Sequence, residues 1–264
     1  MNTLVERYRT RKETTYNAFL CVIGAIFWFG AALHLITADD QERSALLILS
    51  VYVVPFLIIV LISSLLFRAN AMGNMVRVSD EQYPHIHKMI CEGSKTLGIP
   101  PPEAFIYNSN GFLNAFARQV FGRKYLLLTS AIVDATSDDQ VKFVIGHELA
   151  HHAAGHLDLT AVILRLPARI IPFLHKAYSR EREFTCDRLG LVISQDLESA
   201  SKAIAVLGCG CHRLTGNLNL VSFERQENDV PEVSGFVAEL FRTHPRLTRR
   251  LISLKNTILD NSVR

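Results

Sequence analysis

The sequence has few of the features that mark disulfide-stabilised or nucleic-acid-binding proteins. Its 264 residues include five cysteines, an odd and scattered set that does not form a disulfide framework. The net charge is only +3, and no run of lysine and arginine alternates with aromatic residues. We therefore expect no nucleic-acid partner. The cysteine usage fits a reducing compartment better than an oxidising one.

Long uncharged hydrophobic runs, in contrast, are present, and the hydrophobic fraction of 49% is high for a soluble protein. The runs 18–36 and 45–67 are each long enough to cross about 30 Å of hydrocarbon as a helix. A cleaved signal peptide is the alternative for the first run, but a second run follows at once and no clear small-residue cleavage site lies between them. We expect residues 17–67 to form a two-helix transmembrane hairpin that contacts the lipid bilayer.

Basic residues around these runs predict the orientation of the chain. Only Arg43 lies in the connecting loop, whereas six basic residues flank the hairpin on its other side: Arg7, Arg9, Arg11, Lys12, Arg68 and Arg77. Because positive flanks stay in the cytoplasm, we expect a cytoplasmic tail over residues 1–16 and a cytoplasmic domain over residues 68–264.

The stretch around residue 148 carries the strongest functional signal. His147 and His151 are four residues apart, so on a helix they project from one face and can bind one metal ion. Glu148 lies about 100° round the helix from His147, where its carboxylate could take a proton from a metal-bound water. This HExxH pattern is typical of zinc peptidases. His152 lies about 100° from His151 and is left outside the site.

The surroundings of this motif favour a metal site over a chance occurrence. Ser137 and Gln140 form a predicted capping box, so a helix begins where the motif needs one. An apolar stripe that includes Val141 and Leu149 predicts that one side of the helix is buried. Burying a charged glutamate between two histidines costs several kcal/mol unless a partner, such as a dication, compensates.

Short extended segments precede the motif helix. Residues 104–107, 114–120 and 125–129 have strand character, and Gly122-Arg123 predicts a hairpin turn between the last two. We expect a small antiparallel sheet whose edge strand can pair with an extended substrate.

Downstream of the motif, residues 177–194 predict a helix with Glu183 and Asp187 on one face. Glu183 is the candidate third ligand because its longer side chain can reach the metal, while Asp187 could accept a hydrogen bond from a ring nitrogen of a liganding histidine. The alternative is an acidic surface turn paired with arginines of the same helix, namely Arg180, Arg182 and Arg188.

Four further segments have simpler interpretations. Residues 79–97 predict a helix capped by Ser79, and residues 247–259 predict an amphipathic helix. Residues 159–174 are apolar, but their arginines and prolines favour a membrane-surface or substrate-gating helical segment over a third span. The polar stretch 217–235 predicts disorder or a mobile flap.

These features, in this order, resemble one known family. A membrane hairpin, the Asn-Ala-Phe-Ala segment from Asn114, the His147-Glu148-x-x-His151 helix and the later Glu183-x-x-x-Asp187 are similar to HtpX-like membrane-associated zinc metallopeptidases, relatives of the prenyl-protein (CAAX) proteases. Thr243-His244-Pro245 and Arg250 match the family's C-terminal corner. Cys186 departs from the alanine that the family usually has before the aspartate.

The resemblance implies a mainly helical α+β gluzincin fold with a small antiparallel sheet behind the membrane hairpin. It implies one Zn²⁺ per chain on His147, His151 and Glu183, with Glu148 as general base. Four more residues receive roles: Asp187 orients a histidine, Arg250 pairs with Asp187, His244 donates to the oxyanion, and Asn114 contacts substrate.

The expected function is a membrane-anchored zinc endopeptidase that hydrolyses polypeptides, membrane proteins among them, in membrane-protein quality control. The resemblance places it in a bacterial inner or cell membrane. Two alternatives stay open: a site-specific processing peptidase, and a non-catalytic membrane scaffold with a structural zinc site.

Overall fold

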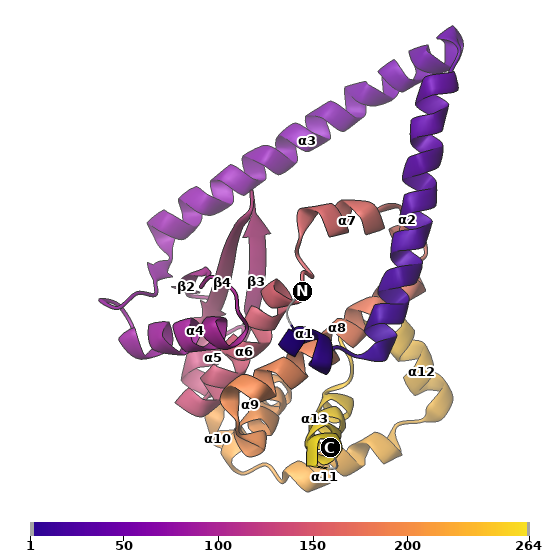
Figure 1. Ribbon diagram of the computed structural model, residues 1–264. Helices are drawn as coiled ribbons and strands as arrows, with labels where there is room; N and C mark the ends of the chain where they lie inside the picture. The colour runs from indigo at the N-terminus through magenta and orange to yellow at the C-terminus, as the bar shows by residue number, and fades with distance from the viewer. Residues whose placement is uncertain (1–2, 263–264) are drawn as a thin grey trace.

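The computed structural model describes residues 3–262 and joins a long helical hairpin to a mainly helical domain with one sheet (Figure 1). After the short helix α1 (Thr3–Tyr8), the hairpin is formed by α2 (Arg11–Thr37) and α3 (Asp40–Asn74). Asp39 begins α3 with a capping box that it forms with Glu42. This cap satisfies the first amides of α3 and lets the chain reverse at the tip.

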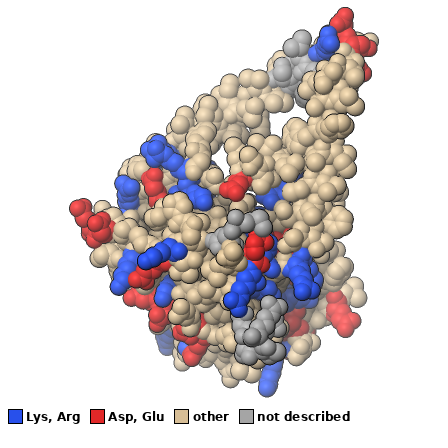
Figure 2. Space-filling view, viewed as in Figure 1, with Lys and Arg blue, Asp and Glu red and all other residues tan. Residues whose placement is uncertain are grey.

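Two helical stretches are long and apolar enough to cross a membrane by length and composition, Arg11–Thr37 and Val53–Asn74. Only 11% of the most apolar window is buried in the first, and 0% in the second. Figure 2 shows charged side chains at the tip of the hairpin and over the domain, while most of the visible length between them is uncharged. Such exposed apolar surface would be unfavourable in water, so a bilayer fits this hairpin.

The sheet has four strands in the order β1-β2-β4-β3. Its strands are β1 (Val76–Arg77), β2 (Glu103–Tyr107), β3 (Ala115–Val120) and β4 (Arg123–Thr129). The predicted hairpin is confirmed, because β3 and β4 pair antiparallel across Gly122. The expectation of a purely antiparallel sheet is wrong, because β2 pairs with β4 in parallel. The mainly helical α+β prediction itself is confirmed.

Successive side chains of β4 point to opposite faces of the sheet. Leu126 and Leu128 pack into the main core with helices of the domain, whereas Tyr125 and Leu127 pack with the end of α3 on the other face. One strand therefore connects the main core of the domain to the end of the helical hairpin. β3 pairs only with β4 and is an edge strand beside the motif helix.

Helices α4 (Pro84–Thr96), α5 (Ser130–Ala135) and α6 (Asp138–Ala153) surround the inner face of the sheet. The predicted capping box of Ser137 and Gln140 is confirmed at the start of α6. The predicted start at Ser79 is wrong, because Ser79 closes a turn with Gln82 and α4 begins after Tyr83, which has a left-handed backbone.

The apolar stretch 159–174 does not form a third span. It is divided into α7 (Leu159–Arg165), the 3-10 turn η1 (Pro167–Ile170) and the start of α8 (Pro172–Ser194), as its two prolines favour. α7 packs against α2: the indole Nε1 of Trp28 donates to the carbonyl of Ile163 at 3.0 Å. A Cβ on Gly24 would lie 1.7 Å from the Leu164 carbonyl oxygen, so only glycine permits this contact.

Short helices complete the C-terminal half of the domain. They are α9 (Leu197–Cys209), α10 (His212–Gly216), α11 (Leu220–Arg225), the 3-10 turn η2 (Gln226–Asp229), α12 (Glu232–Leu240) and α13 (Leu247–Ser262). The disorder predicted for 217–235 is wrong, because this stretch is largely helical. Glu227 bonds Arg246, Arg249 and Thr248 and fastens it to α13.

The N-terminal segment packs into the domain. Val5 of α1 belongs to the main core cluster and is 2% exposed. The backbone amide of Thr10 donates to the hydroxyl of Thr185 in α8 at 3.1 Å, and its hydroxyl donates to Glu181 at 3.0 Å. Residues 3–16 therefore pack against α8, the helix that carries Glu183.

Candidate active site

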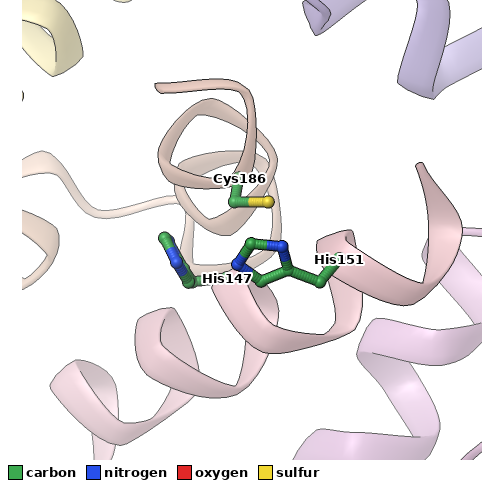
Figure 3. Close-up of side chains that lie close together, drawn as sticks. All are labelled: His147, His151 and Cys186. Atoms are coloured by element: carbon green, nitrogen blue, oxygen red, sulfur yellow. The ribbon is translucent and has the colours of Figure 1, made fainter. Parts of the chain in front are cut away.

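The site is built where α6 crosses α8 at very short range. A Cβ on Gly146 would lie 3.0 Å from the Cα of Gly190, so the two backbones approach closely only because both residues are glycines. Almost the whole second half of α6 is buried, including both histidines of the motif. Figure 3 shows His147 and His151 projecting from α6 toward α8.

The Nε2 atoms of both histidines face the carboxylate of Glu183. His147 Nε2 lies 3.4 Å from Glu183 Oε2, and His151 Nε2 lies 3.6 Å from Glu183 Oε1. Ligands placed tetrahedrally at zinc bonding distances lie about 3.3 to 3.6 Å from one another. The spacing and the nitrogen and oxygen donors therefore fit a zinc ion.

The charge of the site fits the same ion. Glu148, Glu183 and Asp187 are all buried, and Arg250 is the buried cation beside them. As metal ligands, His147 and His151 would both be neutral, and three carboxylates against one guanidinium would then leave an excess of two negative charges, which a divalent cation would balance. Burial raises the pKa of Glu183, but hydrogen bonding to His147 and its positive charge outweigh it and hold that pKa well below the ordinary value.

Cys186 offers a second candidate donor, because its thiol and one ring nitrogen each of His147 and His151 lie within 4.8 Å of one another (Figure 3). The thiol is also 3.7 Å from Nδ1 of His156, which lies 3.0 Å from Nδ1 of His151. Cys186 therefore lies on the Nδ1 side of His151. Burial raises the pKa of the Cys186 thiol well above its usual value. Glu183 instead faces the Nε2 atoms of both histidines, so its position favours Glu183 as the third ligand.

A carboxylate and a guanidinium orient the ring of His147. Its Nδ1 lies 2.9 Å from Asp187 Oδ1, and Arg250 donates to both Asp187 oxygens at 2.8 and 2.6 Å. Burial raises the pKa of Asp187, but the charge and hydrogen bonds of Arg250 outweigh it and lower that pKa. Burial lowers the pKa of His147, but its bonds to Asp187 and Glu183 dominate and raise it to about 10. The pair predicted from the resemblance, Arg250 with Asp187, is present.

The ring of His151 is oriented differently. Its Nδ1 meets Nδ1 of His156 at 3.0 Å, and Nε2 of His156 meets Oε1 of Glu13 at 3.0 Å. Neither His156 nor Glu13 was found from the sequence. Glu13 is 143 residues away from His156 in the chain, so no local spacing could have revealed the pair.

Glu148 lies between the histidine pair and the edge strand. The backbone N–H of Ala117 in β3 donates to Glu148 Oε2 at 2.7 Å. Burial raises the pKa of Glu148 above its ordinary value, although the charge of His147 opposes this. A carboxylate in this place can accept a proton from a water molecule held beside the histidine pair.

A cavity of about 110 Å³ opens beside these groups. It is lined by Asn114, His147, Glu148, Glu183, His244, Arg250 and an apolar set made of Ala115, Ile132, Phe143, Val144, Ala203, Ile204 and Leu207. His244 Nε2 lies 3.7 Å from Glu183 Oε2, and its side chain is 67% exposed. The structure thus brings every residue predicted for the site into one region.

His152 takes no part in this cluster. Its Nε2 lies 2.9 Å from the carbonyl oxygen of Tyr125 in β4. The ring therefore connects α6 to the sheet and points away from Glu183.

Comparison with known proteins agrees with the peptidase-like geometry of this site. The sequence matches peptidase family M48 over residues 80–170 and 158–258, which is more than half of the chain. The chain belongs to this family.

Two relatives of this M48 chain support the resemblance to HtpX-like metallopeptidases that the sequence predicted, and this resemblance is confirmed. Plastoglobule-localized metallopeptidase 48 of Arabidopsis thaliana is 26% identical over 177 residues, which cover 62% of this chain and 51% of the relative.

A protease HtpX homolog of Ralstonia nicotianae is 25% identical over 233 residues, which cover 69% of this M48 chain and 77% of the relative. The crystal structure of S. mikatae Ste24p resembles the chain with a TM-score of 0.52 and 16% identity, over 93% of this chain and 66% of that one. The structural likeness establishes the fold. The chain spans about half the length of the plastid relative.

Proposed function

We propose that this M48 chain is a membrane-anchored zinc-dependent endopeptidase. The observation that carries the proposal is the convergence of His147 Nε2 and His151 Nε2 on the Glu183 carboxylate, with Glu148 beside them. His147, His151 and Glu183 would hold one zinc ion. When bound there, zinc would supply Lewis acidity and lower the pKa of a water molecule to about 7.

The chain's own residues supply the remaining chemistry. Glu148 takes a proton from the attacking water and returns it to the leaving amine. The Nε2 of His244, near Glu183, donates a hydrogen bond to the oxyanion that develops on the peptide carbonyl. Asp187 and Arg250 fix the orientation of His147 throughout.

The edge strand and the cavity are suited to a polypeptide. β3 offers backbone groups along its free side, so an extended peptide can add to the sheet next to Glu148. Asn114 lies at the start of this strand and lines the cavity. A volume of about 110 Å³, with an apolar set of lining residues beside the polar groups of the site, favours one medium-sized apolar side chain of the substrate.

The hairpin suggests where the enzyme works. Its two apolar helices would anchor the domain, and the basic flanks favour a cytoplasmic location for both termini and the active site. The two candidate spans found in the described residues would not by themselves enclose a chamber within the membrane. General proteolysis of membrane-associated proteins in quality control is therefore favoured over processing at a single site.

Metal removal tests the proposal directly. The purified full-length protein should contain one zinc ion per chain and should cleave unstructured peptides. The chelator 1,10-phenanthroline should abolish cleavage, zinc should restore it, and the non-chelating 1,7-isomer should have no effect. Zinc-bound protein that cleaves nothing, or unfolds on chelation, would instead indicate a structural site in a scaffold.

Substrate trapping separates quality control from processing. The Glu148→Gln variant should retain substrates when it is isolated from membranes. A broad set of damaged membrane proteins supports quality control. One recurring partner with a single cleavage site would overturn it in favour of processing.

A further inference from the structure

A buried chain of hydrogen-bonding groups runs from the motif helix to the N-terminal segment. His151 Nδ1 lies 3.0 Å from His156 Nδ1, and His156 Nε2 lies 3.0 Å from Glu13 Oε1. His156 is 2% exposed and Glu13 is 0% exposed. Burying a carboxylate this completely is costly unless it is paired, so the arrangement needs partners on every side.

Those partners are present. The hydroxyl of Thr185 in α8 donates to Glu13 Oε2, and the guanidinium of Arg9 pairs with Glu13 Oε1. The Nη2 atom of the same guanidinium donates to the carbonyl oxygen of Ala154, just past the end of α6, at 3.0 Å. The N-terminal segment thus holds Glu13 against both helices that form the site.

The hydrogen-bond directions in this chain follow from the proposed metal. If His151 binds zinc through Nε2, its Nδ1 carries the proton and donates, and Nδ1 of His156 must accept. Nε2 of His156 then carries its proton and donates to Glu13. Arg182 Nη2 lies 3.4 Å from His151 Nδ1, but a guanidinium only donates and cannot hydrogen-bond an Nδ1 that carries a proton, so the proton of His151 goes to the nearer Nδ1 of His156. One arrangement of protons therefore satisfies both rings and the carboxylate.

We propose that Glu13, acting through His156, is a positioning residue for the metal site. It fixes the ring of His151 and makes that ring a stronger ligand, as carboxylates beside metal-bound histidines do. The inference rests on the proposed zinc site. Because Glu13 lies in the first turn of α2, the helix that continues as the first candidate span, the metal site is complete only when the N-terminal segment is docked.

Zinc affinity of the full-length protein in detergent is the direct measurement. Glu13→Ala should lower the zinc affinity about tenfold, measured in competition with a chromophoric chelator, and the isosteric Glu13→Gln should lower it less. The visible spectrum of the cobalt-substituted protein should change in both. Glu6→Gln is the matched control, because Glu6 pairs with the same Arg9 at 3.5 Å but is exposed. It should bind zinc like the wild type.

A double-mutant cycle tests whether Glu13 acts through His156. The variant carrying both Glu13→Ala and His156→Ala should bind zinc no more weakly than His156→Ala alone. Additive losses would overturn the relay, because Glu13 would then act by another route. A lowered melting temperature with unchanged zinc affinity would also overturn it, since this is what a purely structural role predicts.

The outcomes separate this inference from the proposed function. A wild-type chain that binds no zinc would overturn both. Tight zinc binding by the wild type, together with unchanged affinity and an unchanged cobalt spectrum in Glu13→Gln and Glu13→Ala, would overturn the relay alone.

Discussion

The two sides of the histidine pair have different surroundings. On the Nε2 side, Glu183 and Glu148 face a cavity and an edge strand, where a substrate can reach them. On the Nδ1 side, both rings meet buried partners, Asp187 for His147 and His156 for His151. The open side can carry out chemistry, and the buried side can only hold the ligands in place. Substitutions on the two sides should therefore have different effects.

The largest effect is expected on the open side. Glu148→Gln removes the proton acceptor but keeps the size of the side chain, so peptide cleavage should fall by about 10²- to 10⁴-fold while one zinc ion remains bound. Peptidase assays and zinc analysis of the same preparation measure both. Glu92→Gln, on the exposed surface of α4, is the control and should match the wild type. Cleavage by Glu148→Gln at the wild-type rate would refute the assigned base.

A substitution on the buried side should weaken zinc instead. Asp187→Asn removes the charge that orients His147, and an affinity loss of about 10- to 100-fold is expected. Asp187→Ala should also lower the free energy of unfolding by about 3 to 5 kcal/mol, because it leaves Arg250 buried without its partner. Chelator competition and denaturation give the two numbers. Unchanged zinc affinity in Asp187→Asn would show that the Nδ1 side of the histidine pair does not hold the metal ligands in place.

The helix crossing beneath the site supports both sides. A Cβ on Gly190 would lie 3.1 Å from the carbonyl oxygen of Phe143 and 3.2 Å from the amide nitrogen of His147. Gly190→Ala should push α8 from α6, lower the free energy of unfolding by about 1 to 3 kcal/mol and weaken zinc through Glu183. Thermal unfolding and chelator competition measure these effects. For Gly73→Ala in α3, where nothing lies within 4 Å of the new Cβ, neither loss is expected.

The smallest effect is expected at Glu227, which lies away from both sides of the histidine pair. Burial raises its pKa, but bonds from Arg246, Thr248 and Arg249 outweigh burial and lower it to about 2. A depressed pKa stabilises the fold above the ordinary value of 4.5, and this stability is lost as the pH falls toward 2.

Glu227→Gln should therefore reduce the free energy of unfolding at pH 7 by about 1 to 2 kcal/mol, after discounting for solvent screening. The difference from the wild type should shrink as the pH falls below 4.5. Denaturation curves at several pH values measure it. Zinc affinity should not change, and a loss there would show that residues 217–235 contribute to the site.

Local patterns predicted much of the structure. The capping box of Ser137 and Gln140 determined where α6 begins, and the Gly122-Arg123 turn determined the β3–β4 hairpin. Both depend on residues a few positions apart. The prediction failed where pairing is non-local: β2 joins β4 in parallel, and Glu227 fastens 217–235 to α13. Composition alone cannot reveal such a partner.

The sequence by itself determined the His147-Glu148-His151 face and two apolar helices, because helical periodicity and hydrophobic length are properties of consecutive residues. Only the tertiary structure decided which nitrogen of each ring faces Glu183 and what lies behind it. His147 meets Asp187 40 residues away, and His156 meets Glu13 143 residues away. Contacts of this kind form only when α2, α6 and α8 pack together, and packing brings both ends of the chain to one site.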